Sequence, residues 1–316
     1  MQGKKIVITG GAGAIGCNLV SHLLSLNPEK IIILDNLTSG NLNFLPQDER
    51  VKFIPIDLFF KDKLESSIPT DVDYIFHLAA HFANQNSVEF PLSDIQTNII
   101  GTLNLLEVSK KINLSKIINC SSSCVYGDSQ LMKEDSYVYP NETPYAINKL
   151  AGELYTSFYS EFHNVPTLNL RIFNTYGPFE VSGQYRNVIP NFINKALMGE
   201  PITITGDGSE TRDFTFVSDT CELLVKMALS DKNNGSVYNG GTGIKTTIKE
   251  LAETILDVTK SSSVINFSGK RRWDKVTNRL SDISKTKSTF NYSPSHLNLR
   301  KNLQHTVDWY KAFLQI

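Results

Sequence analysis

Near its start, this 316-residue chain has a glycine-rich turn between a β-branched run and a segment with helical spacing. Residues 5–9 form the β-branched run, residues 10–16 read Gly-Gly-Ala-Gly-Ala-Ile-Gly, and residues 17–24 have helical spacing. Strand, glycine turn and helix thus follow in the order that a dinucleotide phosphate site requires. The glycines permit a tight turn and let backbone N–H groups at a helix N-terminus approach a pyrophosphate. A glycine motif alone is weak evidence for a dinucleotide site, so the residues that follow it must support this interpretation.

A second apolar run at 31–34 ends at Asp35, which lies about 20 residues past the glycines, where an acidic residue is expected to bind the adenosine ribose. The carboxylate would repel a 2′-phosphate, and the loop that follows contains no Arg to receive one. The sequence therefore predicts NAD, rather than NADP, as the cofactor.

Three polar side chains farther along form a catalytic pattern: Ser122, Tyr145 and Lys149. Tyr145 and Lys149 stand at positions i and i+4, so on a helix they share one face. A free phenol has a pKa of about 10, and a neighbouring cation favours its phenolate form. We expect Lys149 to lower the pKa of Tyr145, and the three residues to remove a proton from an alcohol while hydride leaves its carbon.

Apolar runs alternate with helical segments through the first half of the chain. The runs lie at 5–9, 31–34, 51–56, 73–79, 115–120 and 166–173. This alternation predicts a parallel sheet with helices on both faces. Long helices are expected around 94–112 and 143–163. After residue 174 the alternation breaks up, and three segments are rich in turn residues: 176–187, 205–213 and 233–243.

The chain exceeds the usual size of a single hydrophobic core. We predict an α/β fold with a doubly wound parallel Rossmann sheet at 1–173, binding NAD, and a smaller C-terminal substrate domain at 174–316. A segment near 213–235 is expected to return and pack on the first domain.

The formal net charge of −1 gives no electrostatic case for binding nucleic acid or an anionic membrane. The basic cluster at 270–275 would otherwise suggest RNA, but the remainder of the chain is neutral. No apolar stretch approaches the roughly 18 residues of a membrane span. Four scattered cysteines have no metal-ligand spacing, so we expect reduced thiols, no metal site and a cytoplasmic protein.

In order and spacing these motifs resemble those of the extended short-chain dehydrogenase/reductase superfamily and, within it, the NAD-dependent nucleotide-sugar epimerase/dehydratase family. The resemblance covers nearly the whole chain. The matching motifs are an N-terminal fingerprint at 9–16, an adenine-contacting pair at 57–58, a strand-end motif at 77–80, active-site motifs at 121–127 and 145–149, and substrate-side motifs at 170–178 and 206–214.

The resemblance implies a set of ligand-contacting residues. Those for NAD are Gly10, Gly13, Ala14, Ile15, Gly16, Asp35, Asn36, Asp57, Leu58, Leu78, Ala79, Ala80, Asn98, Tyr145 and Lys149. Those for a nucleotide sugar are Ser122, Ser123, Asn174, Asn187, Val188, Arg212, Arg271, Asp274 and Asn278. Arg212 and Arg271 would hold a diphosphate, because guanidinium groups match phosphate oxygens and stay charged. The long helices at 94–112 and 143–163 pack as a four-helix bundle in the family, which implies a homodimer.

The two residues after Ser122 bear on the reaction type. The family's 4,6-dehydratases have Asp-Glu there and its decarboxylases commonly have Ser-Glu, whereas this chain has Ser123-Cys124. Neither residue offers a carboxylate for general acid–base work. The resemblance therefore implies an NAD-dependent 4-epimerase of a nucleotide-diphosphate sugar, first among them a UDP-sugar, acting through a transient 4-keto intermediate. A dehydratase, a decarboxylase, a reductase and a catalytically silent NAD-binding regulator are the alternatives.

The identity of the sugar stays open at this point. Asn278 matches a position that helps determine which C2 substituent fits, but its size does not decide between the groups. Phe82 and Ile172 replace polar residues of the galactose-type relatives. A uronic acid, an N-acetylated sugar and a different nucleotide all remain alternatives to UDP-glucose.

Overall fold

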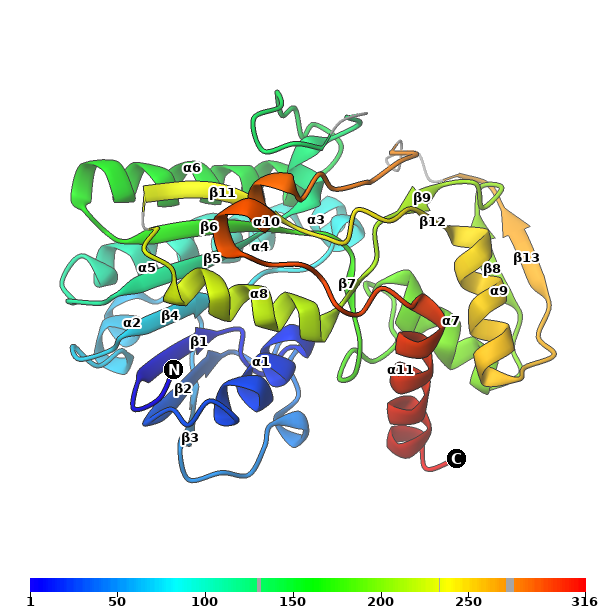
Figure 1. Cartoon of the computed structure of the whole chain (residues 1–316), viewed down its shortest axis with the longest axis horizontal. Coiled ribbons are helices and arrows are strands. Elements are labelled where there is room, and N and C mark those ends of the chain that lie inside the picture. Colours follow the sequence, from blue (N-terminus) through cyan, green and yellow to red (C-terminus); the bar gives the residue numbers. More distant parts are fainter. Residues whose placement is uncertain (130–131, 233, 271–275) are drawn as a thin grey trace.

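The computed structural model describes residues 1–129, 132–232, 234–270 and 276–316. Its first lobe is built on a seven-stranded parallel sheet in the order β11-β6-β5-β4-β1-β2-β3 (Figure 1). The strands are β1 (Lys5–Thr9), β2 (Lys30–Asp35), β3 (Val51–Pro55), β4 (Tyr74–His77), β5 (Lys116–Ser122), β6 (Thr167–Ile172) and β11 (Asn234–Gly240). The first six coincide with the apolar runs of the sequence, and the predicted doubly wound Rossmann sheet is confirmed.

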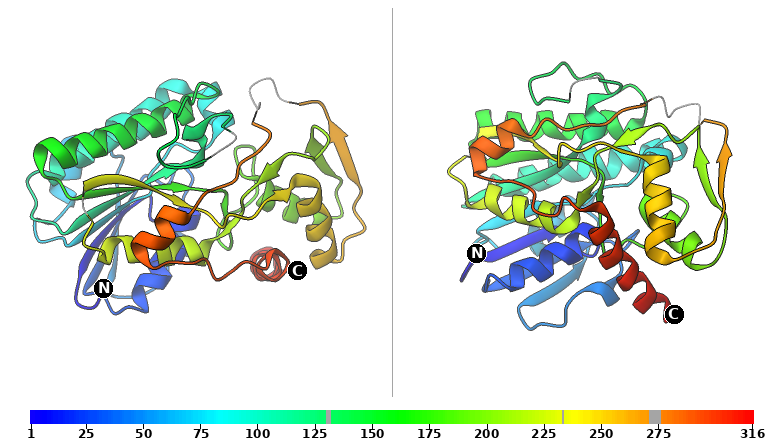
Figure 2. Two further views of the ribbon diagram at one scale, coloured as in Figure 1. Left: turned by 45° about the horizontal axis from the view of Figure 1, so that its top comes forward. Right: turned by 45° about the vertical axis from the view of Figure 1, so that its right-hand side comes forward.

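Helices cover both faces of this sheet, which explains why its strands are nearly continuous apolar runs. On one face lie α1 (Ala14–Leu24) and α8 (Val217–Leu229), whose buried residues share a core with one set of strand side chains. On the other face α2 (Lys61–Ser67), α5 (Thr102–Ser109) and α6 (Pro144–His163) share a second core with the alternate set. Figure 2 shows the two helical layers on either side of the sheet.

The two long helices differ in regularity. The helix predicted at 143–163 is the unbroken α6. The one predicted around 94–112 is instead divided into α4 (Pro91–Ile95), a π-helical turn η2 (Gln96–Gly101) and α5, with α3 (Asn84–Glu89) just before them. In the described ranges, every helix is too short or too polar to span a bilayer.

Strand β11 corrects the expectation that 233–243 is a turn-rich segment of the second domain. Its glycines and asparagines hide its strand character, yet it pairs in parallel with β6 at the edge of the main sheet. The polar side chain of Asn239 is fully bonded there: it accepts from the hydroxyl of Tyr126 at 2.7 Å and donates to the carbonyls of Met132 and Asp282 at 2.8 and 2.9 Å. Because these partners lie far away in the sequence, the local sequence does not predict this strand.

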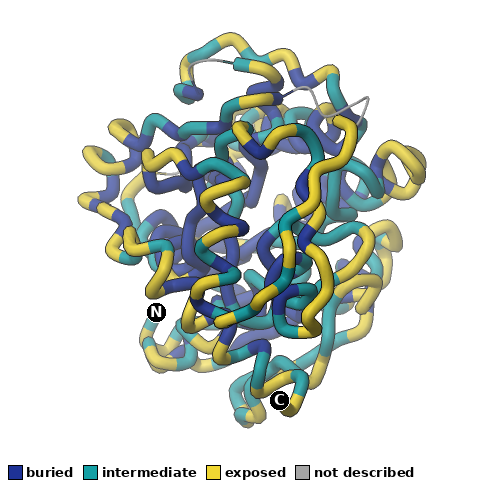
Figure 3. The backbone as a smooth tube through the Cα atoms, turned by 90° about the vertical axis from the view of Figure 1, so that its right-hand side faces the viewer, coloured by how far each residue is buried: buried dark blue, intermediate teal, exposed yellow. Residues whose placement is uncertain are grey.

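The second lobe has its own hydrophobic core, formed by α7, α9, α11 and short strands. Its elements are α7 (Val188–Leu197), β8 (Ile202–Thr205), α9 (Ile248–Thr259), β13 (Ile265–Ser268) and α11 (Leu299–Leu314). Smaller elements complete the fold: β7 (Thr175–Tyr176), β9 (Thr211–Arg212), β10 (Thr215–Phe216), β12 (Thr246–Thr247) and α10 (Ser284–Phe290). Figure 3 shows buried stretches toward the middle of the molecule and exposed ones around its outside.

The chain crosses between the lobes more than once. Helix α8 packs against α1 and β5, and α10 packs against β11, although all of them except α1 and β5 follow residue 174. We therefore propose a boundary near residue 174, with the segments of α8, β11 and α10 assigned to the first domain.

Candidate active site

A cavity of about 980 Å³ lies between the lobes, at the carboxyl ends of the parallel strands. In open α/β sheets, ligands bind at these strand ends, where the strand order reverses. The reversal here falls between β1 and β4, and the residues after both strands line the cavity.

The glycine turn forms one wall of the cavity. Gly10 has φ of 69°, and a Cβ on it would come within 2.6 Å of the backbone nitrogen of Ala79. A Cβ on Gly16 would lie 2.5 Å from the carbonyl oxygen of Gly11. Gly13 caps α1 without any side-chain bond, and the first residues of α1 line the cavity. Because the first N–H groups of a helix have no partner within it, this wall fits a pyrophosphate.

The next wall comes from the ends of β2 and β3. The Asp35 carboxylate accepts hydrogen bonds from the backbone nitrogens of Ala12 and Leu37, at 3.0 and 2.8 Å. Burial raises the pKa of Asp35, and these two bonds oppose the rise. The Asn36 amide donates to Asp57 at 2.9 Å. This wall therefore offers acceptors suited to ribose hydroxyls, beside the phosphate wall.

Most of the expected NAD-contacting residues border this one cavity. They are Gly10, Gly13, Ala14, Ile15, Gly16, Asp35, Asn36, Asp57, Leu58, Leu78, Ala79, Ala80, Tyr145 and Lys149. Asn98 lies behind the wall: its amide oxygen accepts from the backbone nitrogen of His81 at 3.1 Å, and its amide nitrogen donates to the carbonyl of His81 at 3.4 Å. It is not part of the described cavity wall, and its contacts hold the segment after β4 in place.

The proposed catalytic residues meet at the opposite wall. Ser122 ends β5, and Tyr145 and Lys149 lie one turn apart at the start of α6. Helix α6 begins there because Thr143 caps it, accepting from the nitrogen of Ala146 at 3.3 Å, and Pro144 occupies its first turn. All three side chains are buried and line the cavity.

Burial dominates the electrostatics of this wall. It raises the pKa of Tyr145, with Cys124 and Asp94 acting in the same direction and the Ser122 hydroxyl opposing them. Burial also lowers the pKa of Lys149. The direction for Tyr145 is the opposite of the one expected from the Tyr145–Lys149 spacing, because desolvation by burial has the largest effect on the pKa of this phenol.

The expected substrate residues divide into three groups. Ser122, Ser123, Asn174, Asn187, Val188 and Arg212 line the cavity. Asn278 accepts from the hydroxyl of Thr211 at 2.6 Å and is not part of the described cavity wall. Arg271 and Asp274 lie outside the described residues.

Glu180 and Arg279 are among the ionisable residues of the cavity that the sequence did not indicate. Glu180 is buried, which raises its pKa to about 7, and accepts from the Asn187 amide at 2.9 Å. Arg279 is buried and donates from Nη1 to the carbonyl oxygen of Ser123 at 3.0 Å. Their positions held weak signals: Glu180 closely follows the Gly-Pro of a substrate-side motif, and Arg279 directly follows Asn278.

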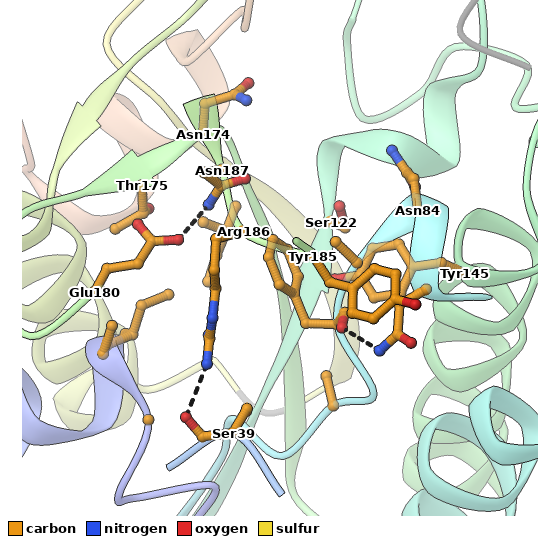
Figure 4. Close-up of a pocket in the computed structure, with 18 of the residues that line it drawn as sticks. Ser39, Asn84, Ser122, Tyr145, Asn174, Thr175, Glu180, Tyr185, Arg186 and Asn187 are labelled. Atoms are coloured by element: carbon orange, nitrogen blue, oxygen red, sulfur yellow. Dashed lines mark hydrogen bonds between the residues drawn. The ribbon is translucent and has the colours of Figure 1, made fainter. Parts of the chain in front are cut away.

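Figure 4 shows how the cavity is shared between the lobes. Asn174, Glu180 and Asn187 lie on the side of the second lobe, and Ser122 and Tyr145 lie across from them. Arg186 extends between the lobes and donates to the carbonyl oxygen of Ser39 at 2.9 Å. Within the described ranges, no group of three or more His, Cys, Asp or Glu side chains is placed to hold a metal ion.

The sequence profile of the family described as "NAD dependent epimerase/dehydratase family" matches residues 6–241. The chain is also similar over 99% of its length to the solved structure of an epimerase from the methanogen Methanothermobacter thermautotrophicus, with a TM-score of 0.96, 38% identity and 94% of that chain covered.

Two further similarities are to proteins whose names include a UDP-sugar. A UDP-N-acetylglucosamine 4-epimerase from Methanobrevibacter ruminantium, solved with UDP-N-acetylmuramic acid, matches with a TM-score of 0.92 and 35% identity over 100% of both chains. A UDP-N-acetyl-alpha-D-glucosaminuronate decarboxylase of Bacillus cytotoxicus is 32% identical over 98% of this chain and 98% of that relative. With the glycine turn, Asp35 and the Ser122, Tyr145 and Lys149 group bordering one cavity, the chain belongs to the NAD-dependent epimerase/dehydratase family, and its cofactor is NAD.

Proposed function

We propose that this enzyme is a 4-epimerase of a UDP-sugar, working through a transient 4-keto form of the sugar. The observation that carries the proposal is the catalytic wall: Ser122, Tyr145 and Lys149 lie together, and the two positions after Ser122 hold Ser123 and Cys124 instead of carboxylates. Such a wall has groups for moving the C4 hydroxyl proton and lacks the usual acid and base for an elimination.

Each residue of the wall has a distinct task in this reaction. When bound, NAD would supply a hydride acceptor and a positive charge. Tyr145 takes the C4 hydroxyl proton and later returns it, while Ser122 hydrogen-bonds the same oxygen. Lys149 would hold a ribose of NAD, and its positive charge would oppose the effect of burial on the Tyr145 pKa. Arg212 holds the diphosphate, so that the sugar turns its other face while the nucleotide stays anchored.

The positions of nearby carboxylates support epimerisation over dehydration. Asp128, the first carboxylate after the Ser122 motif in the sequence, is exposed and is not part of the described cavity wall. Glu134, the next one, accepts from the backbone nitrogen of Asn239 in β11 at 2.8 Å. Glu180 lies on the other side of the cavity from Ser122 and Tyr145 (Figure 4). None of these carboxylates is placed beside the catalytic hydroxyls to remove a C5 proton.

A decarboxylase is the second candidate, because the Bacillus cytotoxicus relative carries that name at 32% identity. Its sugar bears a carboxylate at C6. Loss of carbon dioxide from such a sugar requires a proton donor for C5, and Cys124 replaces the acidic residue that the family's decarboxylases commonly have.

One incubation separates these reactions. The purified enzyme is given UDP-glucose, UDP-N-acetylglucosamine and UDP-glucuronic acid in heavy water, and the products are transferred to ordinary water and examined by mass spectrometry and NMR. An epimerase returns hydride to C4, so the expected product has unchanged mass, inverted C4 and no deuterium on carbon. Loss of water with deuterium at C5 would identify a dehydratase, and loss of carbon dioxide would identify a decarboxylase; either result would overturn the proposal.

We also propose that the enzyme is a homodimer through α6. Helix α6 exposes an apolar stripe at i, i+7, i+11 and i+15, here called the α6 stripe: Ile147, Leu154, Phe158 and Phe162. Neighbouring α3 and α4 expose Val88, Leu92 and Ile95. A contiguous apolar surface of this kind typically marks a protein–protein interface. Two copies of α6 with its neighbours would form the four-helix bundle that the family uses.

Leu154→Glu is expected to weaken the dimer by at least about 10-fold in Kd, since it places a charge in the centre of the apolar face. Leu154 is 63% exposed in the single chain, so the substitution should leave folding intact. Size-exclusion chromatography with light scattering over a range of concentrations measures the change. Leu297→Glu, at a leucine 50% exposed in the segment just before α11, is the matched control. Equal masses for both variants and the parent would contradict this interface.

A further inference from the structure

Arg279 is a buried cation beside the reacting centre. It is 7% exposed and lines the main cavity, and its Nη1 donates to the carbonyl oxygen of Ser123. It also borders a small adjoining pocket together with Cys124 and Glu142. Among the residues that the structure describes, no carboxylate makes an ion pair with Arg279. This includes Glu142, which borders the same small pocket.

An anion would stabilise a guanidinium that is buried in this position. It remains charged at any physiological pH and carries five N–H donors in a planar fork. The Ser123 carbonyl satisfies one of them at 3.0 Å. Buried charges are normally paired, because an uncompensated charge is costly to keep away from water. The contrast with Arg171 is direct: that buried guanidinium makes a two-point ion pair with Glu153.

The place of Arg279 identifies which part of a substrate would supply the anion. This step rests on the proposed function, in which Ser122 and Tyr145 hold the C4 oxygen. Arg279 is bonded to the residue next to Ser122, so its anion lies close to C4. The diphosphate is separated from C4 by the width of the sugar ring and is assigned to Arg212. Among substituents near C4, the one that carries a negative charge in common sugars is C6, attached through C5, when it is oxidised to a carboxylate.

We infer that Arg279 binds the C6 carboxylate of a nucleotide-linked hexuronic acid, and that this acid is the preferred substrate. A planar guanidinium suits a carboxylate because two parallel N–H groups can meet its two oxygens. A neutral hydroxymethyl group at C6 would leave the buried charge without an anion, so the site discriminates against the unoxidised sugar.

The same contact bears on the fate of the keto intermediate. A 4-keto hexuronate is a β-keto acid: breaking its C5–C6 bond releases carbon dioxide, moves the electron pair into an enolate across C4 and C5, and needs a proton at C5. Arg279 stabilises the carboxylate relative to neutral carbon dioxide, which raises the barrier to that cleavage. Cys124 replaces the acidic residue that would deliver the proton. The acid group is therefore kept while C4 is inverted.

The test compares kcat/KM for UDP-glucuronic acid and UDP-glucose in the full-length enzyme and its variants. The parent should favour UDP-glucuronic acid. Arg279→Gln should lower the ratio of the two kcat/KM values by about 100-fold. This is the usual contribution of a charge-assisted hydrogen bond that forms with one substrate and not with the other. Arg279→Lys keeps a charge and should restore part of the ratio. Arg212→Gln is the matched control, because the diphosphate is common to both substrates and the ratio should not change.

Two outcomes would overturn the inference. A parent that prefers UDP-glucose would remove the hexuronic acid as substrate, while leaving 4-epimerisation in place. If both activities fell equally in Arg279→Gln, so that the ratio of the two kcat/KM values did not change, Arg279 would only hold the backbone of Ser123 in place. Conversion of UDP-glucuronic acid with loss of carbon dioxide, or no inversion at C4 with these two sugars and with UDP-N-acetylglucosamine, would instead overturn the proposed epimerase, so the two failures are distinguishable. Circular dichroism and NAD titration of each variant establish that it is folded.

Discussion

Replacing Tyr145 by Phe is expected to lower turnover by about 10³-fold while leaving folding and NAD binding nearly intact, since a positioned proton-transfer group typically contributes 10²- to 10⁴-fold. The Tyr145 ring is 7% exposed and packs edge to face on Phe82, with ring centroids 6.0 Å apart. Phenylalanine keeps this packing and removes the hydroxyl that faces Ser122. The loss should therefore appear in kcat, with little change in the unfolding midpoint.

Tyr126→Phe is the matched control for that experiment. Tyr126 is also buried and lies close to Ser122 in the sequence, but its hydroxyl bonds to Asn239 of β11 at 2.7 Å. Its removal should cost stability and change turnover by less than about 5-fold, because the group takes no part in proton transfer. Steady-state kinetics and calorimetric NAD titration on both variants make the comparison. Near-normal turnover in Tyr145→Phe would mean that a different group acts as the base.

The parts of the fold that the sequence predicted are those with local periodic signals. Six strands were visible because a parallel sheet buried on both faces needs continuous apolar runs. Strand β11 was not, because its Asn and Gly residues have low strand propensity and are satisfied by distant partners such as Tyr126. The division of the helix predicted at 94–112 by a π-helical turn at η2 likewise left no clear signal in the sequence.

The residues of the candidate site could likewise be predicted only where they belong to a local motif. Motif residues such as Gly10, Asp35 and Ser122, which border the cavity, could be predicted because their proposed chemistry needs a fixed order along the chain. Arg279 could not be found this way, because its significance arises only when the C-terminal segment folds back onto Ser123, which lies 156 residues away in the sequence. The pKa direction of Tyr145 was also inaccessible, since spacing reveals the neighbouring cation but not the depth of burial.

A buried ion pair lies directly behind the catalytic wall. Glu153 of α6 accepts from Nε and Nη2 of Arg171 at 2.9 and 2.8 Å, and both side chains are nearly inaccessible to water. The Ser121 hydroxyl donates to the same carboxylate. The Arg171 guanidinium also lies 4.6 Å from the ring centroid of Tyr126. Glu153 therefore joins α6, β5 and β6 beneath Ser122.

Glu153→Ala is expected to lower the free energy of unfolding by about 3–5 kcal/mol, because it leaves the Arg171 charge buried without a partner. Urea unfolding followed by circular dichroism measures the loss. Glu253→Ala, at an ion pair with Lys249 in which both side chains are 58% exposed, is the matched control and should change stability by less than about 1 kcal/mol.

The double variant Glu153→Leu with Arg171→Met distinguishes an unpaired charge from a simple loss of packing. Because apolar residues of similar volume can replace a buried ion pair at little cost, the double variant should recover most of the stability that Glu153→Ala loses. It should not recover full turnover, since the hydroxyl of Ser121 loses its acceptor and the adjacent Ser122 is held less firmly. A double variant as unstable as Glu153→Ala would show that shape at this position, and not the paired charge, stabilises the wall.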